Sequence, residues 1–453
     1  MKSQVEGTKK TKRMERFVVI NADAAGVDIG DTEICVAIGP EKCEENVRTY
    51  GTFTSDLAQI VIFLKENSIQ QVAMEATGVY WIQLYLLLER EGFQVTLANA
   101  RYIKNVSGRK DDENDAMWIQ RLHSCGLING SFQPDWPTRQ LRELVRQRKR
   151  IVSDQSKCVN RMIKALELMN VKVQTVISDI DGKTGRAIVT AILAGERDPA
   201  KLADLADWRI KASREVLMKS LEGNWDALQL FILKQQNDLY DFFTNQIRDI
   251  DFQIEAQLKI VIASRNEGEL PNIDLQQKRK RTTRKNTIPF NATAYLTALL
   301  GVDVTQITGI NELTALAFTA EVGVDMLKWP SAKNFRSWLN IVPTSEKTGG
   351  KIKSERVRKR FHPAGQALRV AAVGVRNSNM PLGHIYRRQL ARGGPSKAIL
   401  SVADRMATAF YHMVRYKQPY QPQTLLENEE KRRIDQIKRL EKRLEKLKIE
   451  YVT

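Results

Sequence analysis

The sequence predicts an N-terminal α/β domain followed by a mostly helical remainder, and three observations support this. Between residues 24 and 123, short apolar runs alternate with amphipathic runs, as strands alternate with helices around a mixed or parallel sheet. From residue 138 to about 262, apolar residues recur at helical spacing. A chain of 453 residues is also too long for one compact core, so we expect two or three domains.

Lysine and arginine number 71 against 53 acidic residues, which gives a net charge of +18. Such an excess points to a polyanionic partner, most often nucleic acid, although a basic protein without that partner has the same composition. The four cysteines lack CxxC spacing and the four histidines form no zinc pattern, which indicates reduced thiols in a cytosolic compartment. No apolar run has transmembrane length and no signal peptide is recognisable, so we expect a cytoplasmic protein without a membrane partner.

The elements of the α/β domain follow one another closely. Short apolar runs predict strands and longer amphipathic runs predict helices. In chain order they are a strand, a glycine turn and a second strand (24–38), a helix (52–67), a strand (71–75), a helix over 76–88 capped by Thr77, and a strand (93–98).

Four carboxylates stand at the ends of these elements. Asp28 lies inside an apolar strand, where a charge is costly unless a partner compensates it, and Glu75 ends another strand. Asp112 and Asp115 are three residues apart before an apolar helical pattern, so we expect both on one face of that helix's first turn. Because α/β sheets place their sites at strand ends, the four predict one site for a hard cation such as Mg²⁺. An ion pair or a helix cap is the alternative for each, most seriously for the last two.

The middle of the chain predicts two long helices, at 141–169 and 225–260, around a smaller helical insert. An antiparallel coiled-coil arm suited to self-association and an ordinary helical bundle both fit this pattern. Residues 264–291 are polar, with a basic run at 278–285, and we interpret them as a linker whose charge contacts phosphates or is only solvated.

A further domain begins near Ala292. The segment 299–323 predicts a helix, a turn containing Gly309 and a second helix, which resembles a helix-hairpin-helix that grips a DNA phosphate, although any αα-hairpin fits. Hydroxyl groups then stand among cations near Gly349-Gly350, as in a loop that binds or attacks a phosphate or in a plain basic loop; they belong to Thr344, Ser345, Thr348 and Ser354.

Three further helices are expected, at 365–375, 396–414 and 427–451. The last is highly charged and carries apolar residues in 3-4-3-4 spacing, namely Ile437, Leu440, Leu444, Leu447 and Tyr451. This spacing predicts a short coiled-coil seam, which at about two heptads is marginal alone.

Several blocks occur in the order found in one known family. They are VDIG, MEATGVYW, GRKDDENDA, ITGINELTALAFTAEVG, SWLNIVP, TGGK and ALRVAA. The chain therefore resembles the IS110/IS1111 insertion-sequence transposases over nearly its whole length. The resemblance implies a RuvC-like (RNase H-like) domain whose DEDD carboxylates are Asp28, Glu75, Asp112 and Asp115, and a mainly α transposase domain with a nucleophilic serine before Gly-Gly-Lys. Thr348 occupies that place here, with Ser345 and Ser354 as alternatives.

The resemblance also implies a mechanism and partners. Mg²⁺ at the carboxylates activates the phosphodiester, and the hydroxyl attacks it to give a covalent protein–DNA intermediate. A non-coding RNA from the element pairs with target and donor DNA, and the protein acts as a dimer or tetramer in the prokaryotic nucleoid. The expected nucleic-acid contacts are Gly309, Lys278, Arg279, Lys280, Arg281, Lys347, Lys351, Lys353, Arg356 and Arg358.

Together these patterns divide the chain into six parts. They are a disordered basic arm (1–20), a RuvC-like DEDD domain (21–137), a helical or coiled-coil region (138–263), a basic linker (264–291), a C-terminal transposase domain (292–420) and a charged C-terminal helix (421–453). Two other functions stay open. One is a RuvC-like nuclease that hydrolyses DNA with water and needs no protein nucleophile, and the other is an inactive copy that only binds DNA or RNA.

Overall fold

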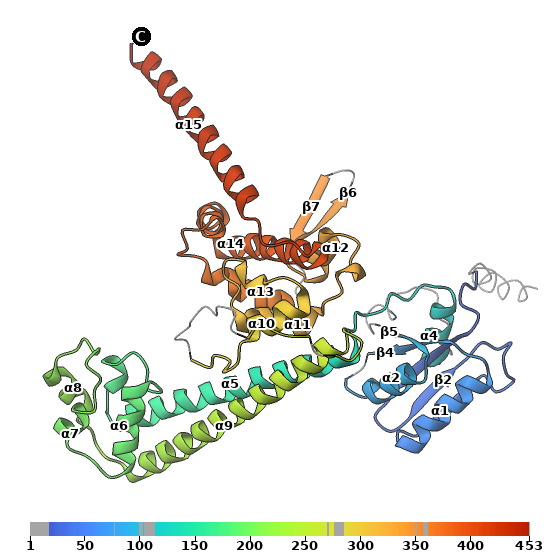
Figure 1. Cartoon of the computed structure of the whole chain (residues 1–453), viewed down its shortest axis with the longest axis horizontal. Coiled ribbons are helices and arrows are strands. Elements are labelled where there is room, and N and C mark those ends of the chain that lie inside the picture. The colour runs from blue at the N-terminus through green and yellow to red at the C-terminus, as the bar shows by residue number, and fades with distance from the viewer. Residues whose placement is uncertain are drawn as a thin grey trace, which may run out of the picture. The chain divides into compact units, whose positions relative to one another are not determined.

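A computed structural model describes residues 18–76, 78–98, 103, 114–269, 271–275, 285–348, 351–356 and 361–452, with only the backbone described for 344–356 and for parts of the last helix. The chain divides into two compact units, residues 1–133 and 134–453 (Figure 1). The expected basic arm lies almost wholly outside the described residues. Among the described helices, none is long and apolar enough to cross a bilayer.

The N-terminal unit is built on a five-stranded mixed sheet with the order β3-β2-β1-β4-β5. The strands are β1 (Ala24–Ile29), β2 (Ile34–Ala37), β3 (Val47–Tyr50), β4 (Gln71–Glu75) and β5 (Gln94–Ala98). β1, β4 and β5 are parallel to one another, whereas β1, β2 and β3 form an antiparallel meander. The mixed sheet is confirmed, and β3 is an additional strand that the sequence pattern did not predict.

Among the described residues, helices on both faces cover the sheet. α1 (Thr54–Glu66) and α2 (Trp81–Arg90) pack on the face that carries Val27 and Met74. α4 (Asp115–Ser124) packs on the opposite face through Trp118 and Ile119. Successive side chains of a strand point to opposite faces of the sheet, so each strand has one face toward α4 and one toward α1 and α2.

The predicted start of the second helix is wrong. α2 begins at Trp81, and Tyr80 occupies the cap position without a side-chain cap bond. Gly78 has a φ of +55°, in the left-handed region, so the chain makes a turn there before the helix begins. Thr77, the expected cap, lies outside the described residues.

The second unit contains the two predicted long helices, α5 (Trp136–Leu168) and α9 (Ala227–Ala263). Figure 1 shows them side by side, and their contacts run in opposite directions along the chain, from Gln140 with Gln257 to Gln155 with Thr244. Between them lie the insert elements η2 (Val173–Thr175), α6 (Lys183–Leu193), α7 (Pro199–Ala203) and α8 (Arg214–Leu221), which share an apolar core with the adjoining ends of α5 and α9. The helical insert is confirmed; self-association of the arm stays a prediction.

The rest of this unit is a helical body with one β-hairpin. Its elements are α10 (Ala292–Leu300), η3 (Val304–Gln306), α11 (Glu312–Val322), η4 (Met326–Lys328), α12 (Ala332–Trp338), β6 (Thr344–Thr348), β7 (Lys351–Arg356), α13 (Pro363–Gly374), α14 (Pro381–Tyr416) and α15 (Gln423–Val452). Aromatic rings form its centre: Phe318 lies 4.6 Å from Phe410 and 6.2 Å from Phe335 between ring centroids.

Two predicted helices in this body are longer than expected. The helix at 396–414 is the second half of α14, which is interrupted by non-helical Gly393 and Gly394 before Pro395. The helix at 427–451 is α15, and its seam residues Ile437, Leu440 and Leu444 are exposed in the single chain.

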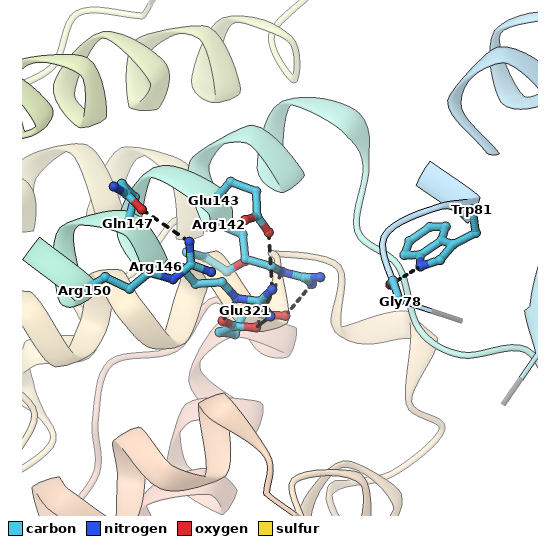
Figure 2. A network of polar contacts seen from close by, with 9 residues as sticks. Gly78, Trp81, Arg142, Glu143, Arg146, Gln147, Arg150 and Glu321 are labelled. Atoms are coloured by element: carbon cyan, nitrogen blue, oxygen red, sulfur yellow. Dashed lines mark hydrogen bonds and ion pairs between the residues drawn. The ribbon is translucent and has the colours of Figure 1, made fainter. Parts of the chain in front are cut away.

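The base of the arm is joined to this body by two arginines, of which Arg142 is buried and Arg146 is partly exposed. Arg142 of α5 donates hydrogen bonds to the carbonyl oxygens of Ala320 (3.3 Å) and Glu321 (2.9 Å), and burial lowers its pKa to about 10. Arg146 binds the Glu321 carboxylate at 2.7 and 2.9 Å, as Figure 2 shows. These bonds fix α5 to the end of α11.

A second buried pair joins α5 to α9. Arg148 contacts Asp251 at 2.5 and 3.1 Å and donates a third bond, of 2.9 Å, to the carbonyl oxygen of Asn286. Both side chains are buried, so each charge depends on the other for its stability.

We expect Asp251→Ala to destabilise this unit by roughly 3–5 kcal/mol, because it leaves the Arg148 guanidinium buried without a counter-charge. Urea unfolding followed by circular dichroism measures this. The double variant Arg148→Met with Asp251→Leu, which removes both charges, is expected to recover most of the loss. A double variant as unstable as Asp251→Ala contradicts the explanation.

Candidate active site

Asp28 and Glu75 lie at the carboxyl ends of neighbouring parallel strands. The β1–β4 register pairs Gly26 with Ala73 and Val27 with Met74, and its continuation sets Asp28 beside Glu75. Adjacent strands are about 4.8 Å apart, so the two backbones are close. Side chains two residues apart on a strand share a face. Ala73 packs with α4 residues, so Glu75, two residues further along β4, belongs to the α4 face. Asp28 lies beside Glu75 in the register and belongs to the same face.

Helix α4 brings Asp115 to the same sheet. Asn114 is its N-cap and accepts a hydrogen bond of 2.8 Å from the Ala116 amide, so Asp115 is the first helical residue. The expectation that Asp112 and Asp115 share the first turn is wrong, because the only acidic residue of that turn is Asp115. Asp112 precedes the cap and lies outside the described residues.

A glycine sets the distance between α4 and β1. A Cβ atom on Gly26 would lie 2.2 Å from the Gln120 amide nitrogen and 2.3 Å from the Ala116 carbonyl oxygen. These are backbone atoms, which cannot rotate away as a side chain can. The helix that carries Asp115 therefore rests directly on the strand that carries Asp28, two residues before that carboxylate.

Cys35 links the cap of α4 to the sheet. It pairs with Asp28 across β1 and β2, and its Sγ lies 3.3 Å from the Asn114 side-chain nitrogen. Burial raises the pKa of the thiol, and the negative charges of Asp28 and Glu33 raise it further. The thiol is free and contacts the cap residue Asn114. Its place opposite Asp28 became visible only with the strand register.

The predicted hydroxyl loop is a β-hairpin. β6 and β7 pair with Thr348 opposite Lys351, Ser345 opposite Glu355 and Ser354 opposite Glu346. Thr348 is the last residue of β6, directly before Gly349-Gly350, which lie outside the described residues. The strand pairing thus places Thr348 nearest the hairpin tip and the two serines farther along the strands.

Comparison with protein families decides what the chain is. A model described as a transposase, the DEDD domain of the IS110 group, matches residues 25–171. A second, described as a transposase of the IS116/IS110/IS902 family, matches residues 303–384. The chain belongs to the IS110 family of transposases. No curated protein matches it significantly.

In this IS110-family transposase, the segment matched by the first model contains the four predicted carboxylates, and the segment matched by the second contains the β6–β7 hairpin. The family makes the chain an enzyme that cleaves and transfers DNA, and the DEDD domain indicates dependence on a divalent metal. The oxygen donors of Asp28, Glu75 and Asp115 are those that hard cations prefer. Among the residues that the structure describes, no three such side chains form a metal-binding group, and Asp112, the fourth predicted ligand, lies outside those residues.

The basic contacts predicted for the transposase lie in two places. Lys347, Lys351, Lys353 and Arg356 are strand residues of the β6–β7 hairpin, of which the backbone is described. The run Lys278–Arg281 and Arg358 lie outside the described residues. The contacts of these basic residues with phosphate groups stay predictions.

Gly309 has a packing role. Its φ is +94°, and a Cβ atom there would lie 2.5 Å from Val375 Cγ1 and 2.7 Å from Met406 Cε. The element before this turn is a single 3₁₀ turn, η3, and not the expected α-helix. Asn311 caps α11, and Glu312 accepts a bond from the Thr293 hydroxyl. Packing and capping therefore explain this turn without a phosphate, and the DNA contact stays a prediction.

We expect Gly26→Ala to lower the stability of the N-terminal unit by about 1–3 kcal/mol and to reduce transposition, because α4 must move off β1. Chemical unfolding and an excision assay measure the two effects. Gly130→Ala is the matched control, since a Cβ atom there would make only an ordinary 3.4 Å contact with Thr96. Equal behaviour of the two variants would refute the role of the close approach.

Proposed function

We propose that this transposase excises and integrates its insertion sequence by Mg²⁺-dependent cleavage and exchange of DNA strands. The observation that carries the proposal is the β1–β4 register, which sets Asp28 beside Glu75, with the Asp115 helix packed on the same face. The separate family matches for the carboxylate region and the hairpin region support it.

The carboxylates act as oxygen donors in this proposal. Asp28 and Glu75 contribute from neighbouring strands, Asp115 from the first turn of α4, and Asp112 from the preceding segment. Together they hold the cation and set its place at the sheet edge. When bound, Mg²⁺ stabilises the negative charge that develops on the phosphate oxygens in the transition state.

Thr348 is the proposed nucleophile, with Ser345 and Ser354 as alternatives. Its hydroxyl oxygen attacks the phosphorus and releases its proton to water, a new O–P bond forms, and the bond from phosphorus to the leaving deoxyribose oxygen breaks. That oxygen takes up a proton. The hydroxyl of a second DNA end then attacks the threonyl phosphodiester and frees the side chain, so the number of phosphodiester bonds is conserved.

The N-terminal unit is proposed to be RuvC-like. Its antiparallel β1–β3 meander followed by parallel β4 and β5 supports this assignment, as does the DEDD family match. The positions of Asp28 near the end of β1, Glu75 at the end of β4 and Asp115 at the start of α4 also support it.

An RNA guide and an oligomer complete the proposal. The net charge of +18 favours backbone contacts to nucleic acid, and base pairing by an element-encoded RNA would supply the sequence recognition. The two-helix arm and the exposed seam on α15 support assembly as a dimer or tetramer.

We expect Asp28→Asn and Glu75→Gln each to reduce excision-circle formation by at least about 100-fold, because charge stabilisation of the phosphate is lost. Junction-specific amplification measures this in cells that carry the gene with its native flanks. DNA affinity, measured by gel shift, should stay within about twofold, since neither carboxylate attracts a phosphate. Loss of binding in step with excision argues against a chemical role.

We expect the wild-type protein to form a detergent-resistant adduct with labelled DNA, and Thr348→Ala to abolish it while Thr348→Ser keeps it, because only a hydroxyl can form the bond. Ser345→Ala and Ser354→Ala are the matched controls. Loss of the adduct at a serine moves the nucleophile there. Cleavage without any adduct establishes the water-dependent nuclease, and binding without cleavage establishes an inactive copy.

A further inference from the structure

Two exposed aromatic side chains stand on the carboxylate edge of the N-terminal sheet. β1, β3 and β4 point in the same direction, so their carboxyl ends share one edge. The turn after β3 carries Phe53, which is 79% exposed, and the turn after β4 carries Tyr80, which is 51% exposed. Asp28 is the penultimate residue of β1, which lies between these two strands in the sheet order.

The neighbours of Tyr80 show that its exposure is specific. Trp81 and Tyr85 follow on α2, pack on the core beneath the sheet and contact each other edge to face at 5.5 Å between ring centroids. Tyr85 is only 6% exposed. The core therefore takes up the aromatic residues of this segment that face it, and Tyr80 lies outside that packing.

The turn that presents Tyr80 is held by its own contacts. Gly78 has a left-handed φ of +55°, and the Trp81 indole N–H donates a 3.2 Å hydrogen bond to the Gly78 carbonyl oxygen, as Figure 2 shows. The Ile82 amide donates to the Val79 carbonyl oxygen at 3.2 Å. An exposed ring on a fixed turn loses little conformational freedom on binding.

Phe53 is held in the same manner on the other side. Its amide donates a 3.0 Å bond to the Asp56 carboxylate. The preceding residue, Thr52, donates its hydroxyl at 3.4 Å to the carbonyl oxygen of Asp31, in the turn directly after β1. This bond places the Phe53 turn at the same edge as the end of β1. Because β3 lies two strands from β1 in the sheet, the ends of these two strands are about 10 Å apart.

We propose that Tyr80 and Phe53 stack against unpaired nucleobases on either side of the phosphodiester that the carboxylates act on. The inference rests on the proposed function, which brings a DNA strand to this edge. Aromatic faces stack on any base without reading its identity, which suits an enzyme whose sequence choice is made by base pairing. The net charge of +18 favours nucleic acid over an apolar protein surface as the occupant.

The first test is photocrosslinking of the full-length protein to single-stranded oligonucleotides of the element end, with 5-iodouracil at successive positions. A stacked aromatic side chain reacts with such a base on irradiation, and mass spectrometry locates the adduct. We expect adducts at Tyr80 and Phe53 from bases flanking the cleaved phosphate, also in an Asp28→Asn background, where no cleavage occurs. Adducts confined to other residues overturn the proposal.

The second test is affinity for the same oligonucleotide, measured by fluorescence anisotropy. Tyr80→Leu and Phe53→Leu should each weaken binding about tenfold, the loss of one stacked base. Tyr80→Phe should bind as the wild type does, because the ring is kept. Trp208→Leu, at a side chain 89% exposed in the other unit, is the control for loss of an exposed aromatic ring.

The outcomes separate this proposal from the proposed function. Normal cleavage with unchanged affinity in both leucine variants overturns the stacking role alone. Stacking adducts without metal-dependent cleavage by the wild type support stacking and contradict the catalytic assignment. A Tyr80→Leu variant that changes oligomeric mass in light scattering, with DNA affinity unchanged, assigns the ring to a protein contact and overturns the proposal.

Discussion

The direct contact between α4 and β1 at Gly26 is the constraint on which the N-terminal unit depends. With no side chain between them, the Gln120 and Ala116 backbones rest on the strand. Other bonds hold the helix in this position, including those from the Ile20 and Asn21 amides to the Ser124 carbonyl oxygen, at 2.8 and 2.9 Å. The position of α4 on β1, the strand that carries Asp28, is therefore a property of the fold.

The sequence predicted those parts of the fold in which local pattern and tertiary packing agree. β1 and β4 are apolar runs bounded by glycine or charge, so their place was clear. β3 was missed because VRTY is short, polar and only half-buried. The β6–β7 hairpin was missed because its hydroxyl-rich and charged residues have the composition of a loop.

Only those parts of the candidate site that lie on clearly patterned strands could be assigned to elements from the sequence. Asp28 and Glu75 follow from their strands, and the register then sets them side by side. The segment before α4 offers several residues able to cap a helix, and sequence alone did not distinguish among them. Asn114 caps it, so the helix begins at Asp115. The contact of Cys35 with that cap depends on a pairing between distant residues, for which the sequence has no local signal.

The attachment of the arm to the C-terminal body has a mechanical consequence. α5 is 33 residues long, or about 50 Å, and Arg142 and Arg146 fix its base to Glu321. Because α5 is held to α11 at its base, a small tilt of the insert at its far end exerts a torque on α11. The length of the two long helices also sets the rotation of the insert about the helix axis. Adding seven residues to each helix would lengthen the arm by about 10 Å and would turn the insert by only about 20°. Related chains can therefore differ in span by one heptad and keep nearly the same angular relation between the arm's tip and the body.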